Sequence, residues 1–292
     1  MPRVNKSIEL LAQRQPIYYD HVEIRDRSYE GGRRLAQTWA DYLIYDMEHH
    51  PFDCSRLAEF MQGLVDGGPT KSGHRTPTVI VTLPATGADE QAFRANAWQV
   101  NQVLAAGVHG ILLCHAESPG AVRAFVEAAR FAFRSGAGEG LGPGRRGNGG
   151  QSYAAHIWGL SVAEYTERAD PWPLNPTGEL LLGLKIENVR ALANAEQVAA
   201  VPGIAFAEWG PGDMGMSFGY PDAHDPPYPP EMQAARDRVL AACKANGLAF
   251  LEMVTPENVV QQIQDGVMIG AGRQAREAAE IGRRHTGRTM PW

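Results

Sequence analysis

Short apolar runs alternate with amphipathic segments along nearly the whole chain. The apolar runs have the length of buried strands and lie at 16–23, 41–48, 78–84, 109–116, 180–187, 204–210, 249–255 and 266–272. Each is followed by a segment in which apolar residues recur at helical spacing, as Leu57, Phe60 and Leu64 do. These segments lie at 29–39, 54–65, 89–106, 119–131, 189–201, 230–245, 256–265 and 274–284.

This alternation predicts a parallel sheet whose strands are connected by helices. About eight strand–helix units in 292 residues fit the size of a (β/α)8 TIM barrel. A doubly wound open sheet is the alternative, but eight units are many for it, and no G-x-G-x-x-G follows an early strand. We therefore predict an α/β fold with one (β/α)8 barrel domain across residues 1–292.

Two stretches interrupt the pattern. Residues 134–153 have glycine at nearly every second position, so we expect no regular element there. This stretch is either a flexible surface insertion or a mobile phosphate-binding loop that uses Arg145 and Arg146. Residues 220–232 are rich in proline and either shape a pocket or pack at a subunit contact.

Composition narrows the class of protein. The chain is 44% apolar and 21% charged, with a net charge of −6, which gives no footprint for nucleic acid or an anionic membrane. The three cysteines, Cys54, Cys114 and Cys243, have no CxxC spacing and favour a reducing compartment. The N-terminus lacks the apolar core of a signal peptide, and no apolar run approaches the roughly 20 residues of a membrane span. We expect a cytoplasmic protein with small-molecule partners.

Acidic residues stand where three of the predicted strands end. Asp46, Glu48 and His49 end one strand, Glu187 ends another, and Asp213 lies just past a third. Barrel enzymes build their active sites at the carboxyl ends of the strands. These side chains should therefore share one rim.

Glu187 and Asp213 are candidate ligands for Mg²⁺ or Mn²⁺, which prefer oxygen ligands. Two carboxylates leave coordination positions for the carboxylate and ketone oxygens of a 2-oxo acid. The metal would then stabilise the enolate that forms when a C3 proton leaves. The alternative for Glu187 is an ion pair with Lys185 or Arg190.

A histidine next to these carboxylates is a candidate general base. His49 has a reference pKa of about 6.5, and Asp46 could orient its ring. His50 is adjacent, and position alone does not decide between the two histidines. In the turn at 210–214, the amides of Gly212 and Asp213 could bind a substrate carboxylate; the alternative is an ordinary strand-to-helix turn.

At these motifs the chain resembles the HpcH/HpaI aldolase and citrate lyase family. The family pattern has a strand ending in D-x-E-H, an arginine before a proline, a strand ending in Q-I-E, and G-P-x-D-L. The corresponding residues here are 46–49, 82–84, 185–187 and 210–214. The resemblance extends over roughly residues 30–285.

The resemblance implies a metal-dependent class II aldolase that reversibly cleaves a 4-hydroxy-2-oxo acid to pyruvate, or a related 2-oxo acid, and an aldehyde. It implies Mg²⁺, Mn²⁺ or Co²⁺ held by Glu187 and Asp213, and it selects His49 as the base, assisted by Asp46. It also implies a homohexamer in which the C-terminal helix is exchanged between neighbouring barrels.

Two departures from the family pattern affect the predicted substrate site. Thr82 takes the place of the arginine that contacts the oxo acid, and Lys185 replaces the usual glutamine. We keep both as substrate-binding candidates. Because Thr82 is smaller than arginine, it suggests a changed preference for the 2-oxo acid, toward a bulkier or hydroxylated one such as hydroxypyruvate. Two alternatives stay open: a lyase for CoA thioesters, with Arg145 and Arg146 near the nucleotide phosphates, and a barrel that has lost catalysis and only binds an oxo acid.

Overall fold

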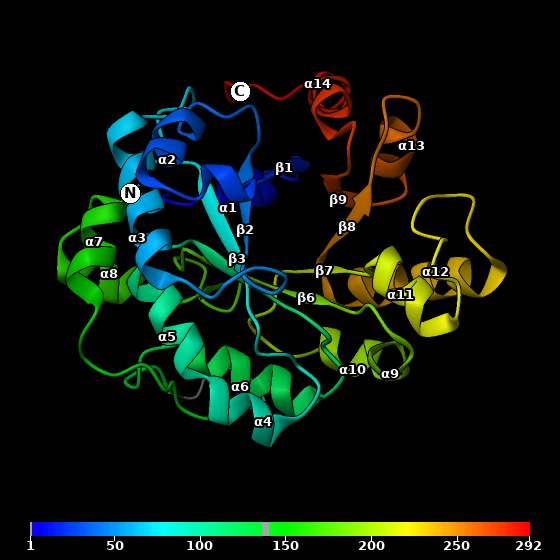
Figure 1. Cartoon of the computed structure of the whole chain (residues 1–292), viewed down its shortest axis with the longest axis horizontal. Helices are drawn as coiled ribbons and strands as arrows, with labels where there is room; N and C mark the ends of the chain where they lie inside the picture. The colour runs from blue at the N-terminus through cyan, green and yellow to red at the C-terminus, as the bar shows by residue number, and fades with distance from the viewer. Residues whose placement is uncertain (1, 136–139) are drawn as a thin grey trace.

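Eight parallel strands close into a barrel in the computed structural model, which describes residues 2–135 and 140–292. The strands are β1 (Ile17–His21), β2 (Tyr42–Asp46), β3 (Thr78–Thr82), β4 (Gly110–Leu113), β6 (Leu180–Lys185), β7 (Phe206–Glu208), β8 (Ala249–Met253) and β9 (Val267–Ala271). Pairing of β4 with β6 closes the barrel, and the two-residue β5 (Pro171–Trp172) pairs with β6. In Figure 1 the strands occupy the centre and the helices surround them. The predicted (β/α)8 barrel is confirmed.

Each predicted strand is found within a few residues of its expected position, because strands buried on both faces are continuous apolar runs. The helices between them are α2 (Tyr29–Leu35), α3 (Cys54–Gly67), α4 (Glu90–Asn96), α5 (Trp98–Ala105), α6 (Pro119–Ala129), α9 (Val189–Ala193), α10 (Ala195–Ala199), α12 (Pro230–Asn246), α13 (Val259–Gln264) and α14 (Ala275–His285). The helices predicted at 89–106 and 189–201 are each divided in two. Ala97 ends α4 and begins α5, and Asn194 does the same for α9 and α10.

The glycine-rich stretch corrects one prediction. Helix α7 (Gln151–Trp158) begins inside it, so residues 151–153 are helical, and α8 (Val162–Arg168) follows. Residues 136–139 lie outside the described residues. Arg146 is buried, with its guanidinium carbon 4.1 Å from the centre of the Phe131 ring and its Nη2 donating to Tyr165 Oη at 2.9 Å. Arg146 therefore packs against residues that flank the insertion, which gives no support to a phosphate-binding role.

The proline-rich loop borders a cavity of about 460 Å³. Pro226, Pro227 and Tyr228 line one side of it, and the end of β8 with Arg236 lines another. The loop thus shapes a pocket, one of the two alternatives predicted for it. Arg236 and Glu252 both line this cavity and form an ion pair, at 2.6 Å from Nε to Oε2.

The amino end of the barrel is closed by α1 (Lys6–Ala12). Ile8, Leu10 and Leu11 of this helix join the apolar cluster that fills the barrel interior. The side chain of Asn5 caps the helix by accepting hydrogen bonds from the amides of Ser7 and Ile8. The interior is therefore a packed core, and the opposite end is where a substrate can enter.

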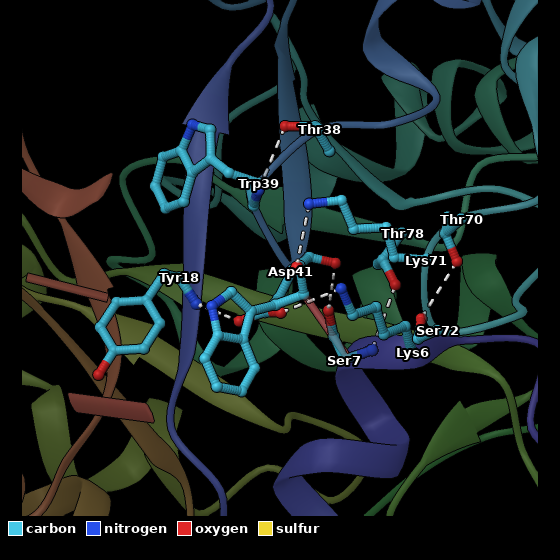
Figure 2. Close-up of polar contacts among 12 residues, drawn as sticks. Lys6, Ser7, Tyr18, Thr38, Trp39, Asp41, Thr70, Lys71, Ser72 and Thr78 are labelled. Carbon is cyan, nitrogen blue, oxygen red and sulfur yellow. Dashed lines mark hydrogen bonds and ion pairs between the residues drawn. The ribbon is translucent and has the colours of Figure 1, made fainter. Parts of the chain in front are cut away.

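A buried ion cluster ties α1 to the C-terminal segment. Asp41, just before β2, contacts Lys6 at 3.2 Å, Arg283 at 3.0 Å and Arg288 at 2.6 Å, and its side chain is fully buried. The Asp41 carboxylate also accepts the amide of Tyr18 at 3.0 Å, as Figure 2 shows. Its position at the amino ends of the strands indicates a role in stability.

Helix α14 packs against β1 and β9 of its own chain, with Tyr18 between the strand and the helix. Exchange of this helix between subunits stays a prediction, as does the hexamer. No described helix is long and apolar enough to cross a membrane.

Candidate active site

Polar side chains gather at the carboxyl ends of four strands. Asp46, Thr82, Lys185 and Glu208 are the last residues of β2, β3, β6 and β7. The registers pair Asp46 with Thr82 and Lys185 with Glu208. The barrel thus brings the predicted residues of separate motifs to one rim.

Asp46 holds His49 in the orientation expected of a base. Its Oδ2 lies 3.0 Å from Nδ1 of His49, and its Oδ1 accepts the amides of Glu48 and His49. Burial opposes ionisation of this carboxyl, but hydrogen bonds from Thr82 and His49 lower the pKa of Asp46 to about 2. An ionised Asp46 accepts a hydrogen bond from the protonated Nδ1 of His49, which leaves Nε2 as the basic nitrogen. His50 lies farther away, at 3.9 Å from Nε2 to Asp46 Oδ2.

The hydroxyl of Thr82 is hydrogen-bonded to the Asp46 carboxylate. This hydroxyl donates to Asp46 Oδ1 at 2.7 Å and accepts the amides of Met47 and Glu48 at 3.2 and 3.3 Å. The side chain is 3% exposed. A direct contact between Thr82 and the substrate stays a prediction, whereas its contact with Asp46 is part of the structure.

Lys185 lies among carboxylates. Its Nζ donates to Glu48 Oε2 at 2.8 Å and lies 3.6 Å from Glu187 Oε2. Burial alone would lower the pKa of Lys185, but the thiol of Cys114 and the neighbouring carboxylates raise it above its ordinary value. Within the described residues it is the only lysine or arginine whose side chain contacts Glu48 or Glu187. The ion pair of Glu187 with Lys185, considered from the sequence, is therefore formed.

Glu187 is 1% exposed, and only one of its two carboxylate oxygens accepts a hydrogen bond. Its Oε1 accepts the amide of His115 at 2.9 Å, but its Oε2 has no hydrogen-bond partner among the described residues. Burial raises the pKa of Glu187 to about 8, against the attraction of Lys185. A buried carboxylate oxygen without a donor is suited to a cation.

The turn before α11 (Pro211–Phe218) lies against Glu187. Gly210 has a positive φ of 51°, and a Cβ there would lie 2.6 Å from the Cβ of Glu187. This contact requires glycine and fixes the start of α11, whose first turn contains Gly212 and Asp213. Asp213 is partly buried, and no described side chain forms an ion pair with it. Carboxylate oxygens are ligands of the kind that Mg²⁺, Mn²⁺ and Co²⁺ accept, and the joint role of Glu187 and Asp213 as ligands stays a prediction.

Three neighbours of this site were not predicted. The thiol of Cys114 lies 2.9 Å from Glu48 Oε2, and Glu208 acts electrostatically on Lys185. His115 has a positive φ of 48°, and its ring nitrogens lie 3.4 Å from Glu187 and 3.7 Å from Glu48. A non-glycine residue in this conformation often marks a functional site. The sequence signal was available, since Cys114 and His115 end a predicted strand.

Comparison with known proteins agrees with this geometry. The sequence profile of the HpcH/HpaI aldolase/citrate lyase family matches residues 33–272. A hydroxypyruvate/pyruvate aldolase of Sagittula stellata is 27% identical over 69% of this chain, and the match spans 64% of that protein. A hydroxypyruvate/pyruvate aldolase of Paraburkholderia phytofirmans is 26% identical over 74% of this chain and 70% of the relative.

Solved structures show the same fold. A HpcH/HpaI aldolase/citrate lyase family protein from Burkholderia cenocepacia superposes with a TM-score of 0.69 at 23% identity, covering 95% of this chain and 97% of that one. The HpcH/HpaI aldolase of Desulfitobacterium hafniense gives a TM-score of 0.67 at 18% identity, with 97% of each chain covered. Because the family profile covers most of the sequence, and its motifs meet at one rim, the chain belongs to the HpcH/HpaI aldolase/citrate lyase family.

Proposed function

We propose that this protein is a divalent-metal-dependent aldolase that reversibly cleaves a 4-hydroxy-2-oxo acid to pyruvate, or a related 2-oxo acid, and an aldehyde. The observation that supports this most directly is the buried Oε2 of Glu187, which accepts no hydrogen bond and lies at the same rim as the Asp46–His49 pair. A cation site and an oriented base are the two groups that enolate chemistry requires. The names of the relatives make pyruvate and hydroxypyruvate the first donors to test.

In the direction of synthesis, Nε2 of His49 takes a proton from C3 of the donor. Asp46 keeps the ring in place and stabilises the imidazolium that results. The C3 carbon then bonds to the aldehyde carbon, and the aldehyde oxygen gains a proton, so no oxidant or reductant is needed. Cleavage is the reverse.

Glu187 and Asp213 are the residues that would hold the cation. A divalent cation supplies positive charge to the oxygen on which the negative charge of the enolate develops. Lys185, which lies next to Glu187, is suited to bind a substrate oxygen by donating a hydrogen bond. The free amides in the first turn of α11, at Gly212 and Asp213, are suited to the donor carboxylate.

The test is exchange of the C3 protons of pyruvate and hydroxypyruvate in D₂O, with Mg²⁺ and with excess chelator. Exchange does not depend on knowing the aldehyde. We expect exchange only with the metal, and a loss of about 10²–10⁴-fold in His49→Ala. His50→Ala is the matched control and should retain most of the rate.

Other outcomes identify the alternatives. Full exchange in excess chelator would refute metal dependence. Absence of exchange with every metal, but tight oxo-acid binding, would indicate a barrel that only binds its ligand. For the CoA-thioester lyase, Arg146 offers no support, since it is packed against Phe131.

A further inference from the structure

His21 is the last residue of β1 and points to the interior of the barrel. Ile17 belongs to the interior apolar cluster, whereas Tyr18 packs outside against α14. The Tyr19 ring lies 5.0 Å from the ring of Tyr42, and the His21 ring lies edge-on at 5.2 Å from Tyr19. Side chains alternate along a strand, so Ile17, Tyr19 and His21 share the inner face.

This position places His21 at the rim that carries the candidate active site. The register pairs His21 with Ile44, two residues before Asp46 on the same face of β2. Burial lowers the pKa of His21; the charges of Asp20, Asp46 and Glu23 oppose this shift and that of Lys185 adds to it, so residues from β2 and β6 act on the ring. His21 therefore faces the same space as the base and the ammonium group.

The strand order places His21 opposite the cation ligands. Four steps along the closed sheet, through β2, β3 and β4, lead from β1 to β6, and four steps through β9, β8 and β7 lead there as well. Glu187 directly follows β6. If the 2-oxo acid binds at Glu187 and Asp213, the aldehyde would therefore bind on the side of β1.

The imidazole of His21 is available for a ligand. It is solvent-exposed, and neither ring nitrogen has a hydrogen bond to any residue in the described parts of the chain. Surrounding protein nevertheless desolvates the ring and lowers its pKa, which is consistent with a neutral imidazole near pH 7. A neutral imidazole offers one N–H donor and one acceptor, the pair that a hydroxyl group matches.

Charge at the rim disfavours an anionic acceptor. Asp46, Glu48, Glu187, Glu208 and Asp213 are acidic, and Lys185 is the lysine that faces them. Arg27 is the arginine beside Asp46, and its guanidinium donates to the backbone carbonyls of Val22 and Asp46 at 3.2 and 2.6 Å, so these contacts already occupy two of its donors. An uncharged aldehyde that bears a hydroxyl group fits this surface better.

We propose that His21 is a specificity residue for the acceptor, and that its imidazole hydrogen-bonds a hydroxyl on the carbon next to the aldehyde group. The favoured acceptor class is then uncharged hydroxyaldehydes. This inference rests on the proposed aldolase function and adds to it the side of the barrel that selects the aldehyde.

The test compares glycolaldehyde with acetaldehyde, which differ by one hydroxyl, as acceptors for pyruvate in the presence of Mg²⁺. Wild-type protein should prefer glycolaldehyde in kcat/KM, and His21→Ala should reduce that preference about twofold to tenfold, the effect of one uncharged hydrogen bond. His21→Asn, which keeps a donor and an acceptor, should restore part of it. His285→Ala, an exposed histidine on α14, is the matched control and should change nothing.

Proton exchange at C3, measured without any aldehyde, separates the two proposals. It should be the same in wild type and His21→Ala, since His21 acts after the enolate forms. Loss of exchange in His21→Ala, or an unchanged acceptor preference, would overturn the assignment of His21. A preference of the wild type for glyoxylate, or none for glycolaldehyde over acetaldehyde, would overturn the acceptor class. Absence of exchange in the wild type would instead refute the aldolase function itself.

Discussion

Replacement of Thr82 by valine removes one hydroxyl from the rim and keeps the shape of the side chain. The Met47 amide retains a hydrogen bond to the backbone carbonyl of Thr82 at 3.2 Å, and the Glu48 amide retains Asp46 Oδ1 at 2.9 Å. The hydrogen bond that is lost without replacement is the one from the Thr82 hydroxyl to the Asp46 carboxylate, at 2.7 Å. Hydrogen bonds to charged groups contribute about 1.5–3 kcal/mol, so the free energy of unfolding should fall by about that amount.

Urea unfolding of Thr82→Val and Thr82→Ser measures this contribution. Serine keeps the hydroxyl and loses one methyl group, which costs about 0.8 kcal/mol when buried. Serine should therefore be the more stable of the two variants. A valine variant as stable as wild type, or more stable than the serine variant, would refute the assignment of Thr82 as a support of Asp46.

The Thr82→Val variant also tests whether Thr82 only stabilises Asp46 or takes part in catalysis. Loss of about 1.5–3 kcal/mol of stabilisation raises the pKa of Asp46 by about one to two units from its value of about 2. Asp46 thus stays ionised at pH 7 and still orients His49. C3 proton exchange in Thr82→Val should fall by no more than about tenfold, well short of the loss expected for His49→Ala. An equal loss in both variants would mean that Thr82 contacts the substrate.

Four further predictions concern the cation site and the amino end of the barrel. Glu187→Gln should abolish metal-dependent exchange while the circular dichroism spectrum is unchanged; retained exchange would remove Glu187 from the ligand set. The pKa of Glu187 is raised to about 8, and its proton must leave before a cation binds. The affinity for Mn²⁺, measured by calorimetry, should therefore rise by up to about tenfold per pH unit below pH 8 and level off above it. An affinity that does not change with pH would contradict this. Asp41→Asn should lower the unfolding free energy by about 3–5 kcal/mol, because three cations lose a buried partner, whereas Asp237→Asn on the surface should change it little. The pKa of Asp41 is held below its usual range, so its contribution is present above about pH 4 and is lost as pH falls below that value; stability of the wild type that is unchanged in acid would contradict this.

The sequence by itself determined the barrel. Strands that are buried on both faces must be apolar throughout, so β2, β3 and β6 are visible as continuous runs without any structure. The ends of these strands were also predictable, because a polar residue after such a run marks the point where the strand leaves the core. Asp46 and Glu187 were found in this way, and the family pattern then gave His49 and Asp213 their predicted roles.

Helix boundaries were less predictable. The break between α4 and α5 at Ala97 leaves the apolar spacing intact, so the pattern predicts one helix where the chain forms two. The start of α7 at Gln151 was missed because glycine-rich sequence disfavours a helix, and only the residues after it pack into the core. Tertiary contacts decided both features.

Only the tertiary structure decided which side chains meet. Lys185 and Glu48 are 137 residues apart, and closure of the barrel brings them to 2.8 Å. The inward direction of His21 follows from its register beside β2, since a shift of one residue would turn it outward. From the sequence, Thr82 is notable only because the family pattern has an arginine at that position. The fold shows that its hydroxyl is hydrogen-bonded to Asp46. Local pattern fixes where a strand lies, but the direction and neighbours of each side chain depend on strand pairing across the closed sheet.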